Sequence, residues 1–104
     1  MNPKFWGMLS LAMRAGKLVL GEDKVLSAIQ SGKASLLLLA DDAGSNTEKK
    51  FLDKSAFYQI SVLRPGDRTR IGNAIGKKNA VVVAVTDTGF QEQLIKLAQD
   101  RTDA

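Results

Sequence analysis

The sequence contains no cysteine and no histidine among its 104 residues. Without thiols it can form no disulfide bond, and it has neither a thiol nucleophile nor an imidazole base. It also lacks the side chains that hold the usual zinc sites. Because these absences exclude most of the usual catalytic groups, we expect a protein that is not an enzyme and that needs no cofactor or metal.

Long hydrophobic stretches are also missing. The apolar run at residues 36–40 is far too short to span a bilayer. The start of the sequence shows no charged segment followed by an apolar core and a small-residue cleavage site. We therefore expect a cytoplasmic protein without a membrane partner.

Positive charge is in modest excess, with 15 Lys and Arg residues against 11 Asp and Glu residues and a net charge of +4. This excess permits a polyanionic partner but does not establish one, because many basic proteins bind no nucleic acid. The length suits one compact domain with a single core. We predict one domain over residues 1–104, with residues 101–104 frayed.

Apolar residues spaced three and four apart predict four helices, and a capping box followed by a polar stretch predicts one more; their limits are marked by glycines and polar capping residues. Either Glu22 or Asp23 is expected to cap the second helix, and Ser45 with Glu48 to form a capping box at the third. The expected helices lie between Pro3 and Gly16, from Gly21 to Gly32, from Ser45 to Phe57, from Asp67 to Gly76, and from Thr86 or Asp87 through Ala98.

Four short apolar runs between these helices predict strands at residues 18–20, 36–40, 60–63 and 80–85. The run of leucines at 36–39 is continuous rather than alternating, as expected for a strand covered on both faces. Strands that alternate with helices predict an α/β fold, a three-layer α/β/α sandwich. Parallel crossovers are expected wherever a helix joins neighbouring strands.

Two acidic motifs have structural rather than catalytic explanations. Asp41 and Asp42 follow a predicted strand, where receiver domains hold a phosphorylatable carboxylate, but the next strand ends in Arg64 rather than the further Asp such a site needs. We interpret them as solvated loop carboxylates. Asp87-Thr88-Gly89 spells the tripeptide of aspartic proteases, yet it opens a predicted helix, so capping is the better interpretation. No glycine-rich nucleotide-binding loop occurs, and we expect no small-molecule substrate.

Basic residues gather near several predicted helix ends. If those ends converge on one rim of the sheet, they form a surface where phosphates gain ionic contacts and helix-end amides. A solvated face that keeps the protein soluble explains the same residues equally well, and charge alone does not decide between the two. The residues are Arg14, Lys17, Lys24, Arg68, Arg70, Lys77 and Lys78.

Five fragments of the sequence carry a resemblance to a known family by their order and spacing. They are A-G-K-x-x-x-G-E-D-x-V-x-x-A-I-x-S-G-K-A, L-L-L-A-D-D-A, N-T-x-K-K, I-G-x-A-I-G-K and V-V-V-A-V-T-D-x-G-F. Together they resemble the kink-turn RNA-binding superfamily of ribosomal proteins L-seven-Ae and L-thirty-e, over residues 5–97. The sequence looks closest to the bacterial YlxQ-type branch. The resemblance implies a mixed four-stranded sheet and a non-catalytic function in binding a kink-turn, a sharply bent RNA duplex with sheared G·A pairs.

The resemblance also implies two RNA contact edges. Archaeal members read the sheared guanines with an Asn and a Glu at the start of the second helix. The matching edge here is Lys17, Gly21, Glu22, Asp23, Lys24 and Ser27. The loop after the fourth helix supplies the second edge, which is Ile75, Gly76, Lys77, Lys78, Asn79 and Ala80. Secondary basic contacts are expected from Arg14, Arg68 and Arg70.

This sequence departs from the family pattern at both edges. Asp23 stands where the family has Asn and lacks the amide donor, while Lys24 replaces a carboxylate acceptor with a donor. Lys77 and Lys78 replace apolar residues that pack on the protruding nucleotide in the family. We therefore expect RNA binding that depends more on phosphates and less on base identity than in the archaeal proteins.

The expected partners are structured RNA, with kink-turns and ribosomal RNA as candidates, and ribosomal particles, bound by a monomer. The alternative is a ribosome-associated structural or assembly module that acts mainly through protein contacts, in which the second helix is merely capped. Association that survives reversal of the charges at these edges would favour the alternative.

Overall fold

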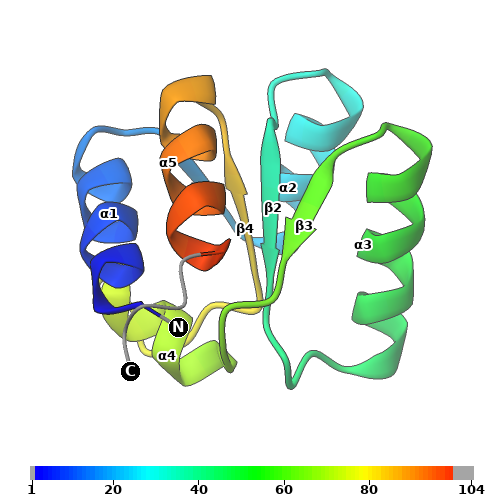
Figure 1. Cartoon of the computed structure of the whole chain (residues 1–104). Coiled ribbons are helices and arrows are strands. Elements are labelled where there is room, and N and C mark those ends of the chain that lie inside the picture. The colour runs from blue at the N-terminus through cyan, green and yellow to red at the C-terminus, as the bar shows by residue number, and fades with distance from the viewer. Residues whose placement is uncertain (1, 100–104) are drawn as a thin grey trace.

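Five helices and four strands alternate within residues 2–99, the part of the chain that the computed structural model describes (Figure 1). The expected fraying of residues 101–104 falls outside that part. Within residues 2–99, no helix combines the length and the hydrophobicity of a membrane-spanning segment. The elements are α1 (Pro3–Arg14), β1 (Leu18–Leu20), α2 (Glu22–Gln30), β2 (Leu36–Leu39), α3 (Ser45–Phe57), β3 (Ser61–Leu63), α4 (Arg68–Ala74), β4 (Val82–Val85) and α5 (Thr88–Gln99).

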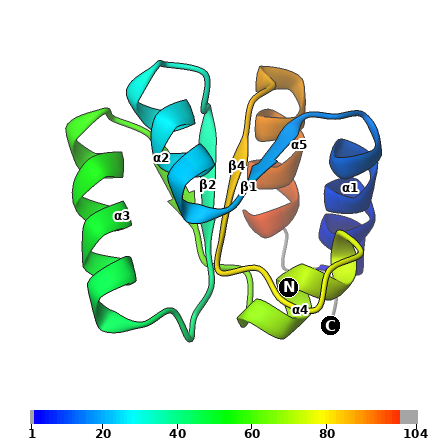
Figure 2. The same cartoon turned by 180° about the vertical axis from the view of Figure 1, so that it is seen from behind.

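The strands form one mixed sheet in the order β1-β4-β2-β3. β2 and β3 are parallel and are joined by α3, whereas β4 runs antiparallel to both of its neighbours. Helices α1, α4 and α5 lie on one side of the sheet, and α2 and α3 lie on the other (Figures 1 and 2). The predicted three-layer sandwich around a mixed four-stranded sheet is confirmed.

The continuous leucine run is explained by the two faces of β2. Successive side chains of a strand point to opposite faces of the sheet. Leu36 and Leu38 pack in the cluster of α1, α4 and α5, and Leu37 and Leu39 pack in the cluster of α2 and α3. All four are fully buried, so every position of this strand selects an apolar side chain.

Helix ends were predicted with mixed success. Asp67 and Asp87 cap α4 and α5 by accepting hydrogen bonds from the N–H groups of Arg70, at 2.8 Å, and Phe90, at 2.9 Å, which confirms both. The capping box at α3 is wrong. Gly44 occupies the N-cap without a side-chain bond, and Ser45 is already the first helical residue.

Other boundaries differ from the predictions too, since β2 ends at Leu39 rather than at residue 40 and β3 begins at Ser61 rather than at residue 60. Neither Glu22 nor Asp23 caps α2, because both lie inside the helix and Gly21 is the N-cap. β4 begins at Val82 rather than at residue 80. Ala80 is drawn away from the strand because its N–H donates to the carbonyl oxygen of Arg68 at 2.9 Å. Residues 80 and 81 therefore belong to the segment that connects α4 to β4.

Candidate nucleic-acid interface

A tight connection leads from β1 into α2. Its single residue, Gly21, has φ +89° and ψ 140°, a conformation that side-chain-bearing residues rarely adopt. The carbonyl oxygen of Gly21 accepts the first helical hydrogen bond, from the N–H of Val25 at 2.9 Å. No side chain caps this end, so the first N–H groups of α2 can donate to an acceptor on a ligand.

The connection from α4 to β4 is folded back against its own helix. The N–H of Lys77 donates to the carbonyl oxygen of Gly72 at 2.9 Å. Gly72 leaves room for the returning chain, since a Cβ there would lie 2.6 Å from the Cα of Asn79. The backbone of the loop is therefore held in place, and this fixes the positions from which its side chains extend.

The pairing of β1 with β4 brings these two segments together. The strands are antiparallel, with Leu20 opposite Val83, so Gly21 comes beside the start of β4. An open groove of about 450 Å³ separates the two segments. Its lining is Leu20, Gly21, Glu22, Ile75, Lys77, Asn79, Ala80, Val81 and Val82. The structure thus joins residues of both predicted edges in one cavity, which we call the α2–loop groove.

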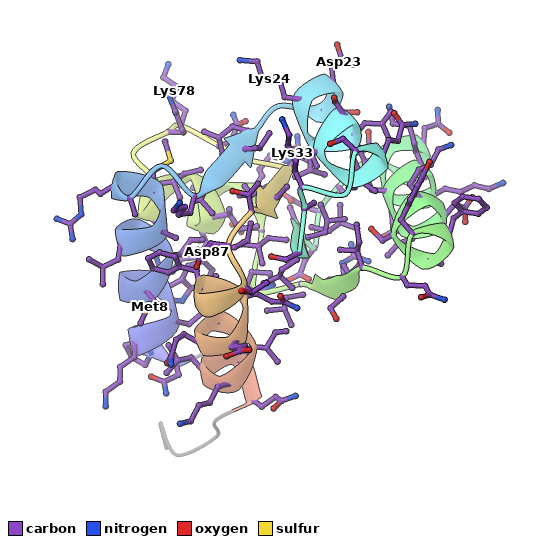
Figure 3. All side chains as sticks on the ribbon, turned by 90° about the horizontal axis from the view of Figure 1, so that it is seen from above. Met8, Asp23, Lys24, Lys33, Lys78 and Asp87 are labelled. Atoms are coloured by element: carbon purple, nitrogen blue, oxygen red, sulfur yellow. The ribbon has the colours of Figure 1, made fainter. Side chains whose placement is uncertain are left out.

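Exposed lysines surround the α2–loop groove. Lys24, Lys77 and Lys78 are all exposed, and none of them forms an ion pair with another described residue. Figure 3 shows Asp23, Lys24 and Lys78 extending from the same side of the molecule. Ser27 is exposed one turn after Asp23 on the same face of α2. This side of the protein therefore offers cations that form no ion pair with residues 2–99.

Glu22, at the edge of the groove, has a partner that the sequence did not indicate. Its carboxylate pairs with the ammonium group of Lys50 on α3, with Oε1 and Nζ 3.5 Å apart. The pair partly neutralises a carboxylate that would otherwise repel phosphates. Lys50 could not be assigned to the site from the sequence, because only the packing of α2 against α3 brings it there.

Arg14 and Lys17 lie away from the groove. The N–H of Thr86 donates to the carbonyl oxygen of Lys17 at 2.9 Å. Lys17 therefore lies beside the C-terminal end of β4, whereas the groove lies at its N-terminal end, near Val82. Figures 1 and 2 both show the connection from α1 to β1 at the top of the molecule and α4 at the bottom. The sequence left open that all the helix ends with basic residues converge on one rim of the sheet. In the structure they do not.

Arg68 and Arg70 are engaged in contacts within the protein. Arg68 donates to the Asp42 carboxylate from its backbone N–H at 3.0 Å and from Nε at 3.2 Å. That backbone hydrogen bond is the main reason that the pKa of Asp42 lies below its ordinary value. The guanidinium group of Arg70 stacks on the ring of Trp6, 4.1 Å from its centre. Asp42 is an exposed loop carboxylate, as interpreted, but one that anchors the start of α4.

Comparison with known proteins identifies relatives over most of the chain. "RNA-binding protein YlxQ" of Bacillus subtilis is 46% identical over 90% of this chain and 94% of its own. A protein of the same name from Enterococcus faecium is 35% identical, with 92% of both chains covered. The large ribosomal subunit protein eL30B of Schizosaccharomyces pombe is 36% identical over 83% of this chain and 75% of its own.

Solved structures show the same fold. A protein of unknown function from Bacillus halodurans C has a TM-score of 0.90 and 44% identity, covering 93% of this chain and 98% of that one. A 15.5kD RNA binding protein from Giardia lamblia has a TM-score of 0.76 at 14% identity, covering 94% and 88%. The model of the ribosomal protein L7Ae/L30e/S12e/Gadd45 family matches residues 4–95. The chain belongs to the ribosomal protein L7Ae/L30e/S12e/Gadd45 family.

Proposed function

We propose that this chain is a non-catalytic RNA-binding protein that recognises kink-turn or similarly bent, structured RNA in connection with the ribosome. The observation that carries the proposal is the α2–loop groove, which joins an uncapped helix end to a fixed loop between exposed lysines. Relatives named as RNA-binding and ribosomal proteins support the same class of partner. We further propose that the protein acts as a monomer in the cytoplasm, where ribosomes are found.

The residues of the α2–loop groove divide into two kinds of contact. Lys24, Lys77 and Lys78 hold phosphates, which accounts for most of the affinity and makes it sensitive to salt. Because Gly21 has no Cβ, the RNA can approach the protein backbone closely there and form hydrogen bonds with it. Asp23 accepts hydrogen bonds from the amino and imino groups of a guanine. Ser27 and Asn79 add neutral hydrogen-bonding groups at the two sides.

The bent shape of the RNA is tested with two molecules of equal length, a standard kink-turn and a straight duplex, titrated over a series of salt concentrations. We expect the kink-turn to bind at least about tenfold more tightly, since only a bent duplex presents its groove and both flanking backbones to the α2–loop groove together. Equal affinities with the same steep dependence on salt would leave only non-specific electrostatic binding.

Base reading by Asp23 is tested with the Asp23→Asn variant. The amide restores a donor that the carboxylate lacks and removes a negative charge near the phosphates. We expect the preference for the kink-turn over the straight duplex to increase by about tenfold, the usual value of one good base contact. Asp41→Asn is the matched control, because it removes the same charge from an exposed loop outside the groove. An equal effect of both variants would show that only net charge matters.

A further inference from the structure

Two exposed aromatic residues lie side by side where α3 ends. Phe57 is 78% exposed, more than any other large apolar side chain in the described part of the chain, and Tyr58 beside it is 39% exposed. Their ring centres are 5.0 Å apart in an edge-to-face arrangement. The inward side of α3 is formed by other residues, Phe51 and Ser55, which are buried. Phe57 therefore contributes little to the core.

Lysines flank these rings and form a second cavity with them. The cavity has a volume of about 440 Å³ and is lined by Lys50, Asp53, Lys54, Phe57 and Tyr58. Positions 50, 53, 54 and 57 follow the helical spacing of three and four, so their side chains share one face. We call this face the α3 face: it carries two aromatic rings, the cation of Lys54 beside the carboxylate of Asp53, and Lys50, whose ammonium group pairs with Glu22.

The α3 face adjoins the α2–loop groove. Lys50 belongs to the α3 face and pairs with Glu22, which lines the α2–loop groove. In Figures 1 and 2, α3 forms the outer edge of the molecule on the side away from α1. A strand that leaves the groove past Glu22 would next meet Lys50, then Lys54 one turn further along α3, and then Phe57.

We propose that the α3 face is a second RNA contact that binds unpaired nucleotides flanking the structured element. Lys54 holds a phosphate, Lys50 joins it when a phosphate displaces the exposed Glu22 carboxylate, and the exposed ring of Phe57, braced edge-to-face by Tyr58, offers a face on which a base stacks. Cationic and aromatic side chains together match a strand that is negatively charged and exposes flat π-faces, and such stacking tolerates any base. The inference rests on the proposed function for its class of partner, and deepens it by adding a single-stranded segment to the RNA that is bound.

Affinity measurements with two RNAs test this contact. One is a kink-turn hairpin, and the other is the same hairpin with a short single-stranded uridine tail. We expect the tail to strengthen binding about tenfold, as one stacked base does. The Phe57→Leu/Tyr58→Leu double variant should lose this gain and keep the affinity for the plain hairpin. Phe57→Trp should retain the gain, because tryptophan keeps a flat ring whereas leucine keeps only the apolar bulk.

The matched control is Leu52→Ala, which removes another exposed apolar side chain of α3 that does not line the cavity. We expect it to leave the tail effect unchanged. Thermal unfolding of each variant verifies the fold, which these exposed positions should affect little. If the tail gives no gain, or if the gain survives in the leucine double variant, the α3 face is not an RNA contact, even though the groove still binds the hairpin.

A titration followed by NMR separates this inference from the proposed function. Single-stranded oligouridylate alone should shift the backbone amide signals of residues 50–58, whether or not the hairpin binds to the groove. If the hairpin fails to bind and oligouridylate still shifts these signals, the kink-turn proposal fails and the α3 contact stands. If an acidic peptide shifts them and oligouridylate does not, the α3 face serves a protein partner and the inference is wrong.

Discussion

Three arginines, Arg64, Arg68 and Arg70, differ from the lysines beside the α2–loop groove in how they are held by the rest of the protein. Arg64 bonds to Glu48 at 2.7 Å and to the carbonyl oxygen of Ala40 at 2.9 Å, and Arg68 and Arg70 are held by Asp42 and Trp6. The lysines beside the α2–loop groove form no ion pair within the described part of the chain. A planar guanidinium group with several donors suits bidentate and stacked contacts inside a fold. The comparison teaches that a count of positive charges overestimates the surface available to RNA.

Charge reversal of the groove lysines should produce the largest effect. We expect the triple variant Lys24→Glu/Lys77→Glu/Lys78→Glu to lose at least about a hundredfold in affinity for structured RNA at low salt, and its slope against log salt to fall by about 2 to 3. Filter binding over a salt series measures both, and sedimentation with ribosomal particles tests the same loss in a cell extract.

The control for this prediction reverses three other exposed lysines, Lys4, Lys33 and Lys96, and so changes the net charge equally. We expect it to lose only a few-fold in affinity through the general field of the protein. An equal loss of affinity in both variants would mean that the groove lysines contribute no more to RNA binding than other exposed lysines. Particle association that survives the groove variant would favour an assembly module that acts through protein contacts.

The fixed loop is the next largest target. In Gly72→Ala the added Cβ would lie 2.6 Å from the Cα of Asn79, so the loop must move away from α4. We expect a loss of about 1–3 kcal/mol in the free energy of unfolding, as for other overpacked sites, and about tenfold weaker RNA binding as the loop lysines shift. Urea denaturation and RNA titration measure the two quantities.

Gly7→Ala is the matched control, since it adds the same methyl group to α1 with nothing within 4 Å of the new Cβ. We expect unchanged RNA binding and a stability that is equal or slightly higher, because alanine favours the helix. If Gly72→Ala destabilises the protein without weakening RNA binding, the position of the loop does not matter for recognition.

Removal of the engaged arginines should affect stability more than binding. We expect Arg70→Lys, which loses the stack on Trp6, to cost up to about 1 kcal/mol, and Arg68→Ala, which loses the exposed contact with Asp42, to lower the Tm only slightly. Affinity for RNA should stay within about twofold of the wild type, because these guanidinium groups already contact Asp42 and Trp6. A tenfold loss would show that they do reach RNA, as the family resemblance implies, and would remove the distinction between the arginines and the lysines.

The smallest expected effect is in the response to acid. The pKa of Asp42 is lowered in the folded protein, so its contact with Arg68 contributes stability at neutral pH and loses it as the pH falls below about 4. The difference in Tm between the wild type and Asp42→Asn should therefore shrink on acidification. Asp41→Asn, which removes the neighbouring exposed carboxyl, should show a smaller change. A constant difference for Asp42→Asn would mean that the contact with Arg68 is not ionic in solution.

Local patterns were sufficient for much of the fold. Helical spacing located α1, α2, α4 and α5. Asp67 was recognised as a cap, and Asp87 as one of two candidates with Thr86, because a cap bonds to N–H groups of its own first turn. The capping box at Ser45 failed because the helix begins one residue earlier than the motif requires, with Gly44 as its N-cap, and the carboxylate of Glu48 pairs with Arg64 on a different segment. A motif with two members predicts well only when neither has a stronger partner elsewhere in the fold.

The sequence by itself determined the order of the elements and the apolar strand covered on both faces, whereas the residues of each predicted RNA edge follow from the family resemblance. Periodicity and glycine placement are local properties that survive without knowledge of the fold. Only the tertiary structure decided that Gly21 and the loop after α4 face each other, because the antiparallel register of β1 with β4 sets that approach. The tertiary structure alone also decided that Arg68 and Arg70 contact Asp42 and Trp6 and that Phe57 lies outside the core. These three outcomes depend on how segments distant in the chain pack together.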